Sequence, residues 1–502
     1  MMENVVMQYP SIDWLAVAPI IVLLVGMMVN LVAAALTRPW PRAWYAIGNL
    51  ELAVAAIIIE MFLWHDIGRD GSRIIINDSL SIDHFTMLCW IGIAGALGLV
   101  SLATADYLRR EQLEGPEVYA LYICAALGAM IMTAANDMIV LFLGLETLSI
   151  ALYVLAASHR RRTESQESGL KYFILGGFAS AFLLYGIALL YGSTGTTNIS
   201  GIGRVLSTEV FVNGDDAMLL AGVALLLVGL AFKVAVAPFH FWTPDVYQGA
   251  PTPVTAFMAS VGKFAAFAAM ARILLIALPT RIDDWRPVIW VLAVLSVVVG
   301  SVMAVVQTDV KRMLAYSSIS HAGFIMIGIE AAGHAGDSDG LPAVLLYLVI
   351  YSVLVIGTFT VVTLVTRTGD AGSDIGSFRG LGRQRPALAL AMTVFLLAQA
   401  GMPTTSGFIA KFGVITAAAS NRSYAIAIIA MVASVIAAVL YLRIMISMWM
   451  ADSESGDDAR ENVRVPATAN VVIIAATVFT LVVGVFPGWL IDAARTAASF
   501  AG

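Results

Sequence analysis

Charged residues are scarce in this sequence. Only 12% of its 502 residues are charged and 60% are hydrophobic, whereas an ordinary soluble domain carries roughly 25% charged residues. Long polar segments are missing as well, and no connection between apolar runs is long enough to fold as a soluble domain. We therefore expect a protein whose main surroundings are a lipid bilayer.

Cysteines and nucleotide-binding motifs are also nearly absent. Cys89 and Cys124 lie in or beside apolar runs and cannot supply the four thiolates of an iron–sulfur cluster, nor do they suggest a disulfide framework. No GxGxxG or Walker motif is present. We expect no cofactor in this chain, no metal site, no nucleic-acid partner, and no redox or ATP chemistry carried out by its own residues.

Apolar runs long enough to cross a bilayer, about 20 residues each, recur along the whole chain. They cover residues 13–37, 44–64, 84–105, 117–134, 137–157, 171–191, 217–238, 252–277, 287–306, 312–330, 342–366, 386–413, 423–449 and 467–489. The first run lacks a basic leader and a small-residue cleavage site, so it is expected to be a retained span. The pattern predicts an all-α polytopic membrane protein with about fourteen transmembrane helices.

Lys and Arg in the short loops predict the orientation, because they favour the cytoplasmic side. One set of alternate loops holds sixteen: Arg38, Arg42, Arg109, Arg110, Arg160, Arg161, Arg162, Lys311, Arg312, Arg367, Arg379, Arg383, Arg385, Arg443, Arg460 and Arg464. The other set holds seven: Arg69, Arg73, Arg204, Arg281, Arg286, Arg422 and Arg495. We therefore expect both termini on the outer, periplasmic side.

Several ionisable residues lie inside the apolar runs rather than in loops. They are Glu146, Lys171, Lys233, Lys263, Arg272, His321 and Lys411. A charge at the bilayer centre costs about 2.5–3.5 kcal/mol even on a lenient scale, so such residues usually face a bundle interior and mark an ion path. Static lysine–glutamate pairs that tie helices together are the alternative, but four lysines cannot all pair with one well-centred glutamate. Arg272 is nearer a run end and is expected to reach the interface.

A lysine and a carboxylate in such surroundings can form a switch. Desolvation makes a lysine easier to deprotonate, and a nearby carboxylate opposes this. Lys233 is therefore expected to hold a proton when Glu146 is close and to release it when Glu146 moves or is neutralised. Further lysines on other helices would form a relay, with linking waters held by hydroxyls such as those of Tyr316, Ser317 and Ser318.

Two runs contain helix-breaking residues beside a lysine. Pro238 cannot donate to the carbonyl of Val234, so the seventh helix should break one turn beyond Lys233. In the twelfth run Gly401, Pro403 and Gly407 precede Lys411. Ordinary proline kinks are the alternative reading. An odd separation of five runs gives the two helices opposite directions, which is the pattern of inverted repeats with sites at the breaks.

The inverted-repeat pattern divides the chain into four parts. We predict three N-terminal helices in 1–115, a first five-helix repeat in 116–278, a second inverted five-helix repeat in 279–450, and a last helix in 451–502.

Several long motifs then match one family in order. The segment "PFHFWTPDVYQGAPTPVTAF" resembles the signature of the antiporter-like membrane subunits of proton-pumping NADH:quinone oxidoreductase, respiratory complex I. Its residues are similar to those of the N-type members, whereas M-type, L-type and cation/proton antiporter members usually have the motif "HxWLPDAHxxAPT". The resemblance continues in "LGLETLSIALYVL", "ESGLKYFILGGFASAFLLYG", "TDVKRMLAYSSISHAGF" and "GMPTTSGFIAKF", over about residues 115–450.

The resemblance implies fourteen helices in two inverted five-helix repeats, with helices 7 and 12 broken. It also implies roles for particular residues. Glu146 and Lys233 would be the paired switch of a first half-channel, Lys263 a central relay lysine and Lys411 the lysine of a second half-channel. Lys171 and His240 match connecting positions, and His321 matches a polar position on helix 10.

The resemblance further implies a subunit of an enzyme, in which proton transfer from cytoplasm to periplasm is driven by quinone reduction in neighbouring subunits. FMN, iron–sulfur clusters and quinone would be bound by partner subunits and not by this chain. The chain would lie in the membrane arm of a respiratory complex in a bacterial inner membrane, beside M-type and K-type subunits.

Two acidic positions, Asp245 and Glu167, keep more than one interpretation. Asp245 is either a helix cap, which we favour, or a site of proton uptake. Glu167 is either an i,i+4 partner of Lys171 or a site of proton uptake, with neither favoured. Glu51 and Glu60 in the second run are interpreted as structural.

Two other functions remain open besides the complex I subunit. One is a subunit of a multisubunit cation/proton antiporter or a membrane-bound hydrogenase with the same fold. The segment "VYQGAPTPV" disfavours this function. The other is a passive scaffold whose buried charges only hold helices together.

Overall fold

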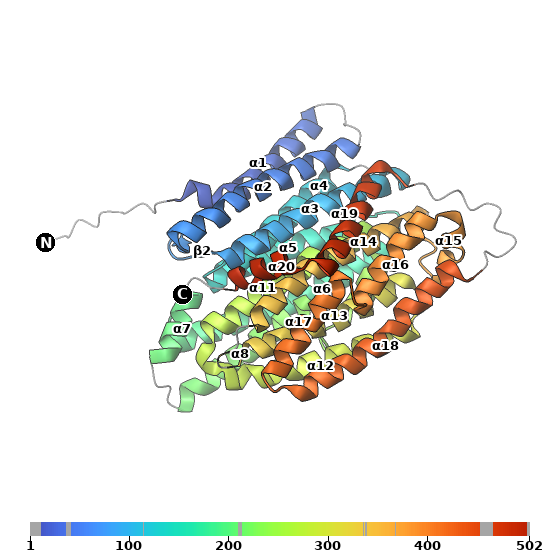
Figure 1. Ribbon diagram of the computed structural model, residues 1–502. Helices are drawn as coiled ribbons and strands as arrows, with labels where there is room; N and C mark the ends of the chain where they lie inside the picture. The colour runs from blue at the N-terminus through green and yellow to red at the C-terminus, as the bar shows by residue number, and fades with distance from the viewer. Residues whose placement is uncertain are drawn as a thin grey trace.

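The apolar runs fold into long helices that lie side by side with their axes close to parallel (Figure 1). This arrangement follows from the medium, because lipid offers no hydrogen-bond partners and a helix satisfies its backbone internally. The computed structural model describes residues 12–36, 42–113, 115–208, 213–334, 336, 339–366, 368–451 and 465–498. Arg38, Arg367, Arg460 and Arg464, used above to predict the orientation, lie outside these residues.

The chain begins with three long helices and a short hairpin. They are α1 (Trp14–Leu36), α2 (Arg42–Asp70), β1 (Arg73–Ile75), β2 (Leu80–Ile82) and α3 (His84–Arg110). The two strands pair antiparallel, with Arg73 opposite Ile82 and Ile75 opposite Leu80. Asp83 caps α3, because its side chain accepts a 2.7 Å hydrogen bond from the backbone N–H of Thr86.

The next group of helices contains the first break. It comprises α4 (Pro116–Ala134), α5 (Met138–Ala156), α6 (Thr163–Thr194), α7 (Ile199–Thr208), α8 (Asn213–Val234), α9 (Trp242–Gly249), α10 (Thr252–Phe257), the π-helical turn η1 (Met258–Gly262), α11 (Lys263–Arg272) and a second π-helical turn η2 (Ile273–Ala277). The segment from α10 to η2 is one continuous apolar span. The π turn η1 ends directly before Lys263, and such turns are frequent at functional sites.

The remaining helices contain the second break. They are η3 (Pro279–Arg281), α12 (Ile282–Val306), α13 (Val310–Ala332), α14 (Gly340–Val365), η4 (Thr368–Asp370), η5 (Ile375–Phe378), α15 (Leu381–Gln384), α16 (Pro386–Ala400), α17 (Ser406–Ser420), α18 (Tyr424–Trp449), α19 (Ala467–Val485) and α20 (Gly488–Ala497). Here η3, η4 and η5 are short 3₁₀ turns.

The prediction of an all-α polytopic membrane protein is confirmed. Among the described residues, twelve helical segments are long and apolar enough to cross a membrane. The other two predicted spans are α13, which is more polar, and the pair α16 and α17, which are apolar but individually short. The fold is therefore the expected all-α polytopic one, while the four sequence boundaries proposed for its parts stay a prediction.

The first break comes sooner than Pro238 alone suggested. Helix α8 ends at Val234, one residue after Lys233, and helical structure resumes only at Trp242. Other groups satisfy the interrupted backbone: the N–H of Ala237 donates to Ser296 Oγ at 2.8 Å, and the Trp242 indole donates to the carbonyl of Phe232 at 3.1 Å. The break therefore lies inside protein, as freed backbone at membrane depth requires.

The second break lies between α16 and α17. Gly401 adopts a φ of +90°, a conformation that glycine takes without steric cost, and α17 begins at Ser406. The Lys411 ammonium donates to the carbonyl of Ala400 at 3.1 Å, so a lysine satisfies the last carbonyl of the helix before it. Each broken helix thus brings a lysine ammonium to its break: Lys233 is the last residue but one of α8, and Lys411 on α17 reaches the end of α16.

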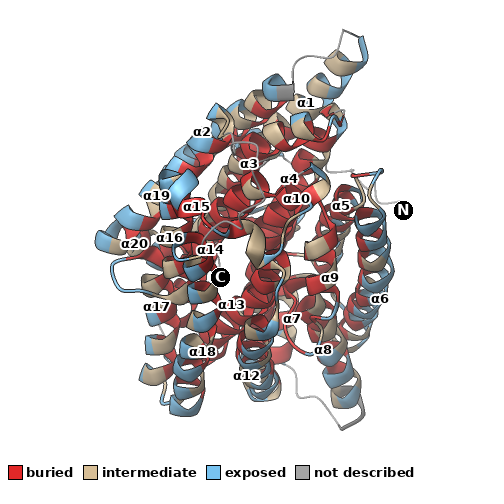
Figure 2. Ribbon diagram, turned by 90° about the vertical axis from the view of Figure 1, so that its right-hand side faces the viewer, coloured by how far each residue is buried: buried red, intermediate tan, exposed pale blue. Residues whose placement is uncertain are grey.

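Buried residues fill the centre of the bundle and exposed apolar ones cover its outside (Figure 2). Helix α14 and the span from α10 to η2 are almost entirely buried. Helices α6, α12, α18 and α19 instead expose large apolar side chains, including Phe178, Val302, Val435 and Val478. These outer faces are suited to lipid or to neighbouring subunits.

The interpretation of Arg272 as an interface residue is wrong. Its side chain is fully buried, and its two terminal nitrogens each lie 3.0 Å from a carboxylate oxygen of Asp83. The guanidinium also donates to the carbonyl of Thr133 and to the hydroxyl of Thr86. Removing one partner of such a pair typically costs about 3–5 kcal/mol, so this contact fastens α11 to α3.

Candidate functional site

The first cluster surrounds Lys233 at the end of α8. Its ammonium donates to Ser149 Oγ at 2.7 Å and to the hydroxyl of Tyr172 at 3.3 Å, and lies 5.4 Å from the centre of the Tyr172 ring. Lys233 is buried. Its hydrogen-bond partners are neutral hydroxyls, so the lysine can lose or gain a proton without breaking an ion pair.

Glu146 lies on α5 and is only half-buried. Its carboxylate accepts a hydrogen bond from Ser180 on α6. Within the described residues it forms no direct ion pair with Lys233; instead Ser149, three residues further along α5, stands next to the lysine. Ser149, Ser180 and Lys233 line one small cavity. The two predicted members of the switch thus each bond to a serine of the same cavity.

Lys171 lies away from that cluster, near the start of α6. It pairs with Glu167 at 2.7 Å and with Asp245 on α9 at 2.9 Å, and Asp245 also pairs with Arg312 on α13 at 2.6 Å. The i,i+4 pairing of Glu167 is therefore confirmed. The cap interpretation of Asp245 is wrong, because its carboxylate bridges two basic side chains from different helices.

The Lys171 ion pairs border a polar cavity of about 440 Å³. Charged side chains from three segments line it, namely Arg162, Glu167 and Asp370 among others. Asp370 is buried and receives hydrogen bonds from Arg162 at 2.9 Å and from Thr252 at 2.8 Å. Burial raises the pKa of Asp370, but Lys311 and Arg162 more than offset this and hold the pKa below its usual value. Asp370 thus stays ionised beside the cavity.

His240 lies within the first break, between α8 and α9. It is buried, its ring stacks on Phe241, and the ring of Tyr316 lies 6.4 Å away. Its Nδ1 has no hydrogen-bond partner among the described residues. The structure therefore places His240 at the break, but gives it no direct hydrogen bond to any of the lysines.

The second cluster begins at Lys263, on α11. Its buried ammonium donates to the backbone carbonyl of Ser318 on α13 at 2.6 Å. The hydroxyl of Ser318 in turn accepts a 2.8 Å hydrogen bond from Tyr351 on α14. Lys263 is therefore attached to the helix that also bears His321.

His321 is held between two tyrosines. Its Nδ1 lies 2.6 Å from the hydroxyl of Tyr347, and its Nε2 lies 3.2 Å from the hydroxyl of Tyr441. Tyr441 also shares a 2.6 Å hydrogen bond with Ser317. Hydroxyl and imidazole groups both donate and accept hydrogen bonds, so this buried set can pass a proton along itself.

Lys411 completes the second cluster on α17. Besides donating to Ala400, its ammonium lies 4.9 Å from the centre of the Phe324 ring. Phe324 is three residues beyond His321 on α13, and the two rings are 6.5 Å apart. Within the described residues no carboxylate lies at ion-pair distance from Lys411.

Aromatic rings separate the two clusters. Tyr172 stacks on Trp242 at 4.5 Å, and Trp242 meets Tyr247 edge to face at 6.2 Å. The tyrosines at 172, 347, 351 and 441 are inconspicuous in the sequence, because an aromatic residue in an apolar helix looks like an ordinary core residue. The feature that could have identified them is a hydroxyl at membrane depth, because a buried tyrosine hydroxyl needs a hydrogen-bond partner.

The sequence of this chain matches a known protein family and several of its members. Residues 135–437 match the sequence profile of the proton-antiporter family described as NADH:quinone oxidoreductase/Mrp antiporter, transmembrane. NADH-quinone oxidoreductase subunit N of Trichlorobacter lovleyi is 43% identical over 84% of this chain and 85% of its own length. NADH-quinone oxidoreductase subunit N 1 of Herpetosiphon aurantiacus is 40% identical over 97% of both chains.

A solved structure agrees with these relatives. A chain of respiratory complex I from Thermus thermophilus with bound aureothin is 30% identical, covers 95% of this chain and 99% of its own, and superposes with a TM-score of 0.79. That structure is a multisubunit assembly, so a chain similar to this one works within a complex.

Proposed function

The chain belongs to the NADH:quinone oxidoreductase and Mrp antiporter family of membrane subunits, and we propose that it is an N-type, proton-translocating subunit of a respiratory NADH:quinone oxidoreductase. The observation that carries this proposal is the buried row of protonatable groups. Lys233, Lys263 and Lys411 are each buried at membrane depth and hydrogen-bonded to neutral oxygen atoms. Buried ionisable groups in a membrane typically mark a proton path.

In this proposal each residue has a separate task. Glu146 controls the charge of Lys233 in the first cluster, through the intervening serines. Lys263 is the central relay group, since it is attached to the α13 helix next to the tyrosine and histidine set. Lys411 is the last lysine of the relay. Lys171 and His240 connect these groups to the polar cavity and to the first break.

The driving force comes from outside this chain. Quinone reduction in neighbouring subunits supplies free energy, and conformational or electrostatic coupling brings it to Glu146, which is half-buried on the outside of the bundle. Moving a charge near Glu146 changes how tightly Lys233 holds its proton. The proton then passes laterally through the second cluster, from cytoplasm to periplasm.

The proposal extends to the surroundings of the chain. FMN, iron–sulfur clusters and quinone are bound by partner subunits, and M-type and K-type subunits are the neighbours in the membrane arm. The membrane is a bacterial inner membrane with both termini on the periplasmic side. The two inverted repeats occupy residues 116–278 and 279–450.

Co-purification tests this proposal. The chain is tagged in its own host, the complex is extracted in mild detergent, NADH:quinone reductase activity is measured, and the associated chains are identified by mass. We expect flavin-binding and iron–sulfur subunits with active turnover. Recovery of the chain alone, or with antiporter-type partners only, would contradict the assignment to NADH:quinone oxidoreductase.

The second candidate is a subunit of a cation/proton antiporter or a membrane-bound hydrogenase. It is favoured by the breadth of the matching family, whose description includes Mrp antiporters. The same purification separates the two candidates, because an antiporter complex would exchange cations for protons in vesicles without NADH.

A further inference from the structure

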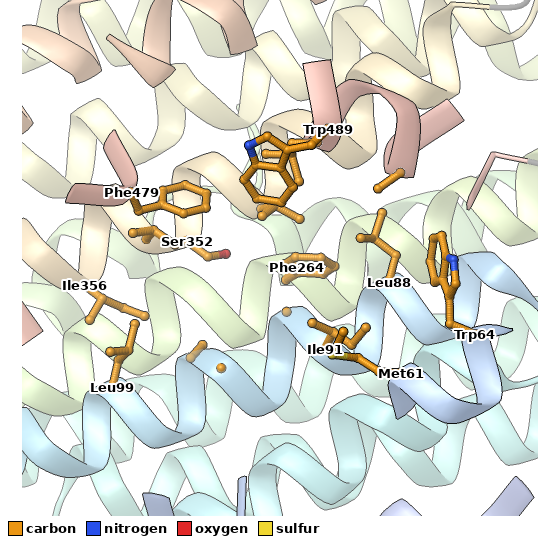
Figure 3. A pocket seen from close by; sticks show the side chains of 17 residues that line it. Met61, Trp64, Leu88, Ile91, Leu99, Phe264, Ser352, Ile356, Phe479 and Trp489 are labelled. Carbon is orange, nitrogen blue, oxygen red and sulfur yellow. The ribbon is translucent and has the colours of Figure 1, made fainter. Parts of the chain in front are cut away.

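A separate cavity of about 410 Å³ is lined by Phe264, the residue that follows Lys263 on α11 (Figure 3). Helices α2, α3 and α11 form one side and α14, α19 and α20 the other. Figure 3 places Phe264 in the middle, with Trp489 and Phe479 facing it from the C-terminal helices and Trp64 and Met61 from α2. None of the groups assigned above to proton transfer lines this cavity.

The walls of the cavity are almost wholly apolar. Ser352 is the one lining residue with a hydroxyl, and that hydroxyl already donates to the carbonyl of Leu348 at 2.8 Å. A buried water needs two to four polar partners, and these walls do not provide them. The occupant is therefore expected to be hydrocarbon rather than water or a polar ligand.

The mouth of the cavity opens onto the outer apolar surface of the bundle. Met61 and Trp489 line the cavity and are 62% and 54% exposed. Their neighbours Phe62 and Phe486 are 69% and 70% exposed, so the lining continues into an apolar outer surface. At membrane depth the medium in contact with such a surface is lipid hydrocarbon.

The length of the cavity corresponds to one leaflet. Its α3 wall runs from Leu88 to Leu99, which at 1.5 Å per residue spans roughly 16 Å, about half of a hydrocarbon core of about 30 Å. In the orientation proposed above, α3 begins on the periplasmic side, so the cavity lies in the outer leaflet. Trp64 and Trp489 stand near the end where interfacial tryptophans are common.

The volume distinguishes a lipid chain from a protein helix. One turn of an α-helix, 5.4 Å long and about 10 Å wide, already occupies roughly 420 Å³, so a helix spanning the leaflet does not fit. A flexible chain of a dozen or so methylenes does fit, if each takes roughly the 30 Å³ of a water molecule. We propose that this cavity binds one acyl chain of an outer-leaflet phospholipid.

The proposed acyl chain would lie directly behind the relay. Phe264 adjoins Lys263, and Ser352 adjoins Tyr351 of the second cluster. Hydrocarbon in the cavity keeps water away from that side of the two helices. The binding site rests on the proposed orientation only for its assignment to the outer leaflet; its chemistry is independent of proton translocation.

Substitution of Gly95 by a larger residue would fill the cavity. A Cβ added there meets nothing within 4 Å, whereas one at Gly92 would lie 2.8 Å from Phe264. Gly95→Phe therefore places a ring in the open space, and Gly95→Ala makes the same backbone change while leaving most of the space open. Val353→Phe fills the cavity from the opposite wall, on α14.

The test uses the intact complex in nanodiscs that contain a phospholipid with a photoactivatable diazirine in the middle of one acyl chain. After irradiation, labelled peptides are mapped by mass spectrometry. We expect label on residues 84–110 and 340–365 in the wild type and in Gly95→Ala, and loss of that label in Gly95→Phe and in Val353→Phe.

Three results would overturn the proposal. The first is absence of label from these peptides in the wild type. The second is label that persists in both filled variants. The third is a helix or side chain of a partner subunit in the cavity, seen by electron cryomicroscopy of the same preparation. Each can occur whether or not the chain translocates protons, so failure here is distinguishable from failure of the proposed function.

Discussion

The lysines at the two helix breaks have different surroundings. Lys233 bonds to the hydroxyls of Ser149 and Tyr172, and Glu146 lies one turn away along α5. Lys411 bonds to a backbone carbonyl and faces an aromatic ring, and within the described residues no carboxylate lies at ion-pair distance. One lysine therefore has an acidic residue near enough to modulate its charge, and for the other we propose that protons arrive through His321 and its tyrosines.

The difference also concerns access. Glu146 is half-buried on the outside of the bundle, where a neighbouring subunit can act on it. The set around His321 is buried and is formed by residues of α13, α14 and α18. We expect the first cluster to respond to neighbours and the second to depend on the continuity of its own hydrogen bonds.

The largest effect is expected from replacing either lysine by arginine. Arginine keeps the positive charge but cannot be deprotonated in proteins, so a relay must stop. We expect Lys233→Arg and Lys411→Arg to lower the rate of proton translocation about 100-fold, the scale of a lost proton-transfer group. Translocation is measured with a pH-sensitive dye in inverted vesicles. Lys233→Met and Lys411→Met, which remove the charge, are the comparison. If translocation is lost in the methionine variants but retained in the arginine variants, these lysines act only as structural charges.

A smaller effect is expected from Glu146→Gln, which breaks the first cluster alone. Glutamine keeps an oxygen that can accept from Ser180 but cannot carry a negative charge. We expect translocation to fall roughly 10-fold, less than a full proton-transfer group contributes. Glu51→Gln is the matched control, because Glu51 is an exposed carboxylate on α2. Equal losses in both variants would show that the position of the acid is irrelevant.

Removing one tyrosine hydroxyl tests the second cluster. Tyr441→Phe deletes the group that contacts both Ser317 and His321. We expect translocation to fall about fivefold, the equivalent of about 1 kcal/mol for a net hydrogen bond. Tyr424→Phe changes an exposed tyrosine on the same helix, α18, and should leave the rate unchanged. The same vesicle assay applies, and an unaffected Tyr441→Phe would remove this hydroxyl from the relay.

The smallest effect is expected from Phe324→Leu, which removes the ring beside Lys411. A cation–π contact contributes about 0.5–1 kcal/mol at an ordinary site, so the rate should change about two- to fivefold. The apparent pH dependence of translocation is measured along with the rate. A loss as large as that of Lys411→Arg would mean that the ring is required for more than contact with the ammonium.

Much of the fold could be predicted because the bilayer imposes a simple length rule. The fourteen apolar runs correspond to the helices and broken pairs of the structure, and Gly401 and Pro238 correctly indicated the two breaks. The start of the first break was misplaced, since the chain leaves the helix at Val234 before the proline ring requires it. The sequence showed which helices break but not at which residue.

The candidate site was predictable only in part. The buried lysines, Glu146 and His321 are conspicuous because a charge is costly in lipid. Their partners are not, since Tyr347 and Tyr441 resemble core aromatics until the fold brings their hydroxyls to His321. Arg272 was misinterpreted for the same reason: its partner Asp83 is 189 residues away in sequence and could not be assigned from spacing.

The most direct test of the relay is proton translocation by vesicles carrying Lys263→Met, with the amount of assembled complex measured in the same preparation. Lys263 begins the second cluster, and its ammonium bonds to a single backbone carbonyl. The account predicts assembly at the wild-type amount and a loss of translocation of about 100-fold, as for a lost proton-transfer group. Translocation at the wild-type rate would contradict a path through this chain, and a loss of assembly together with activity would indicate a scaffold.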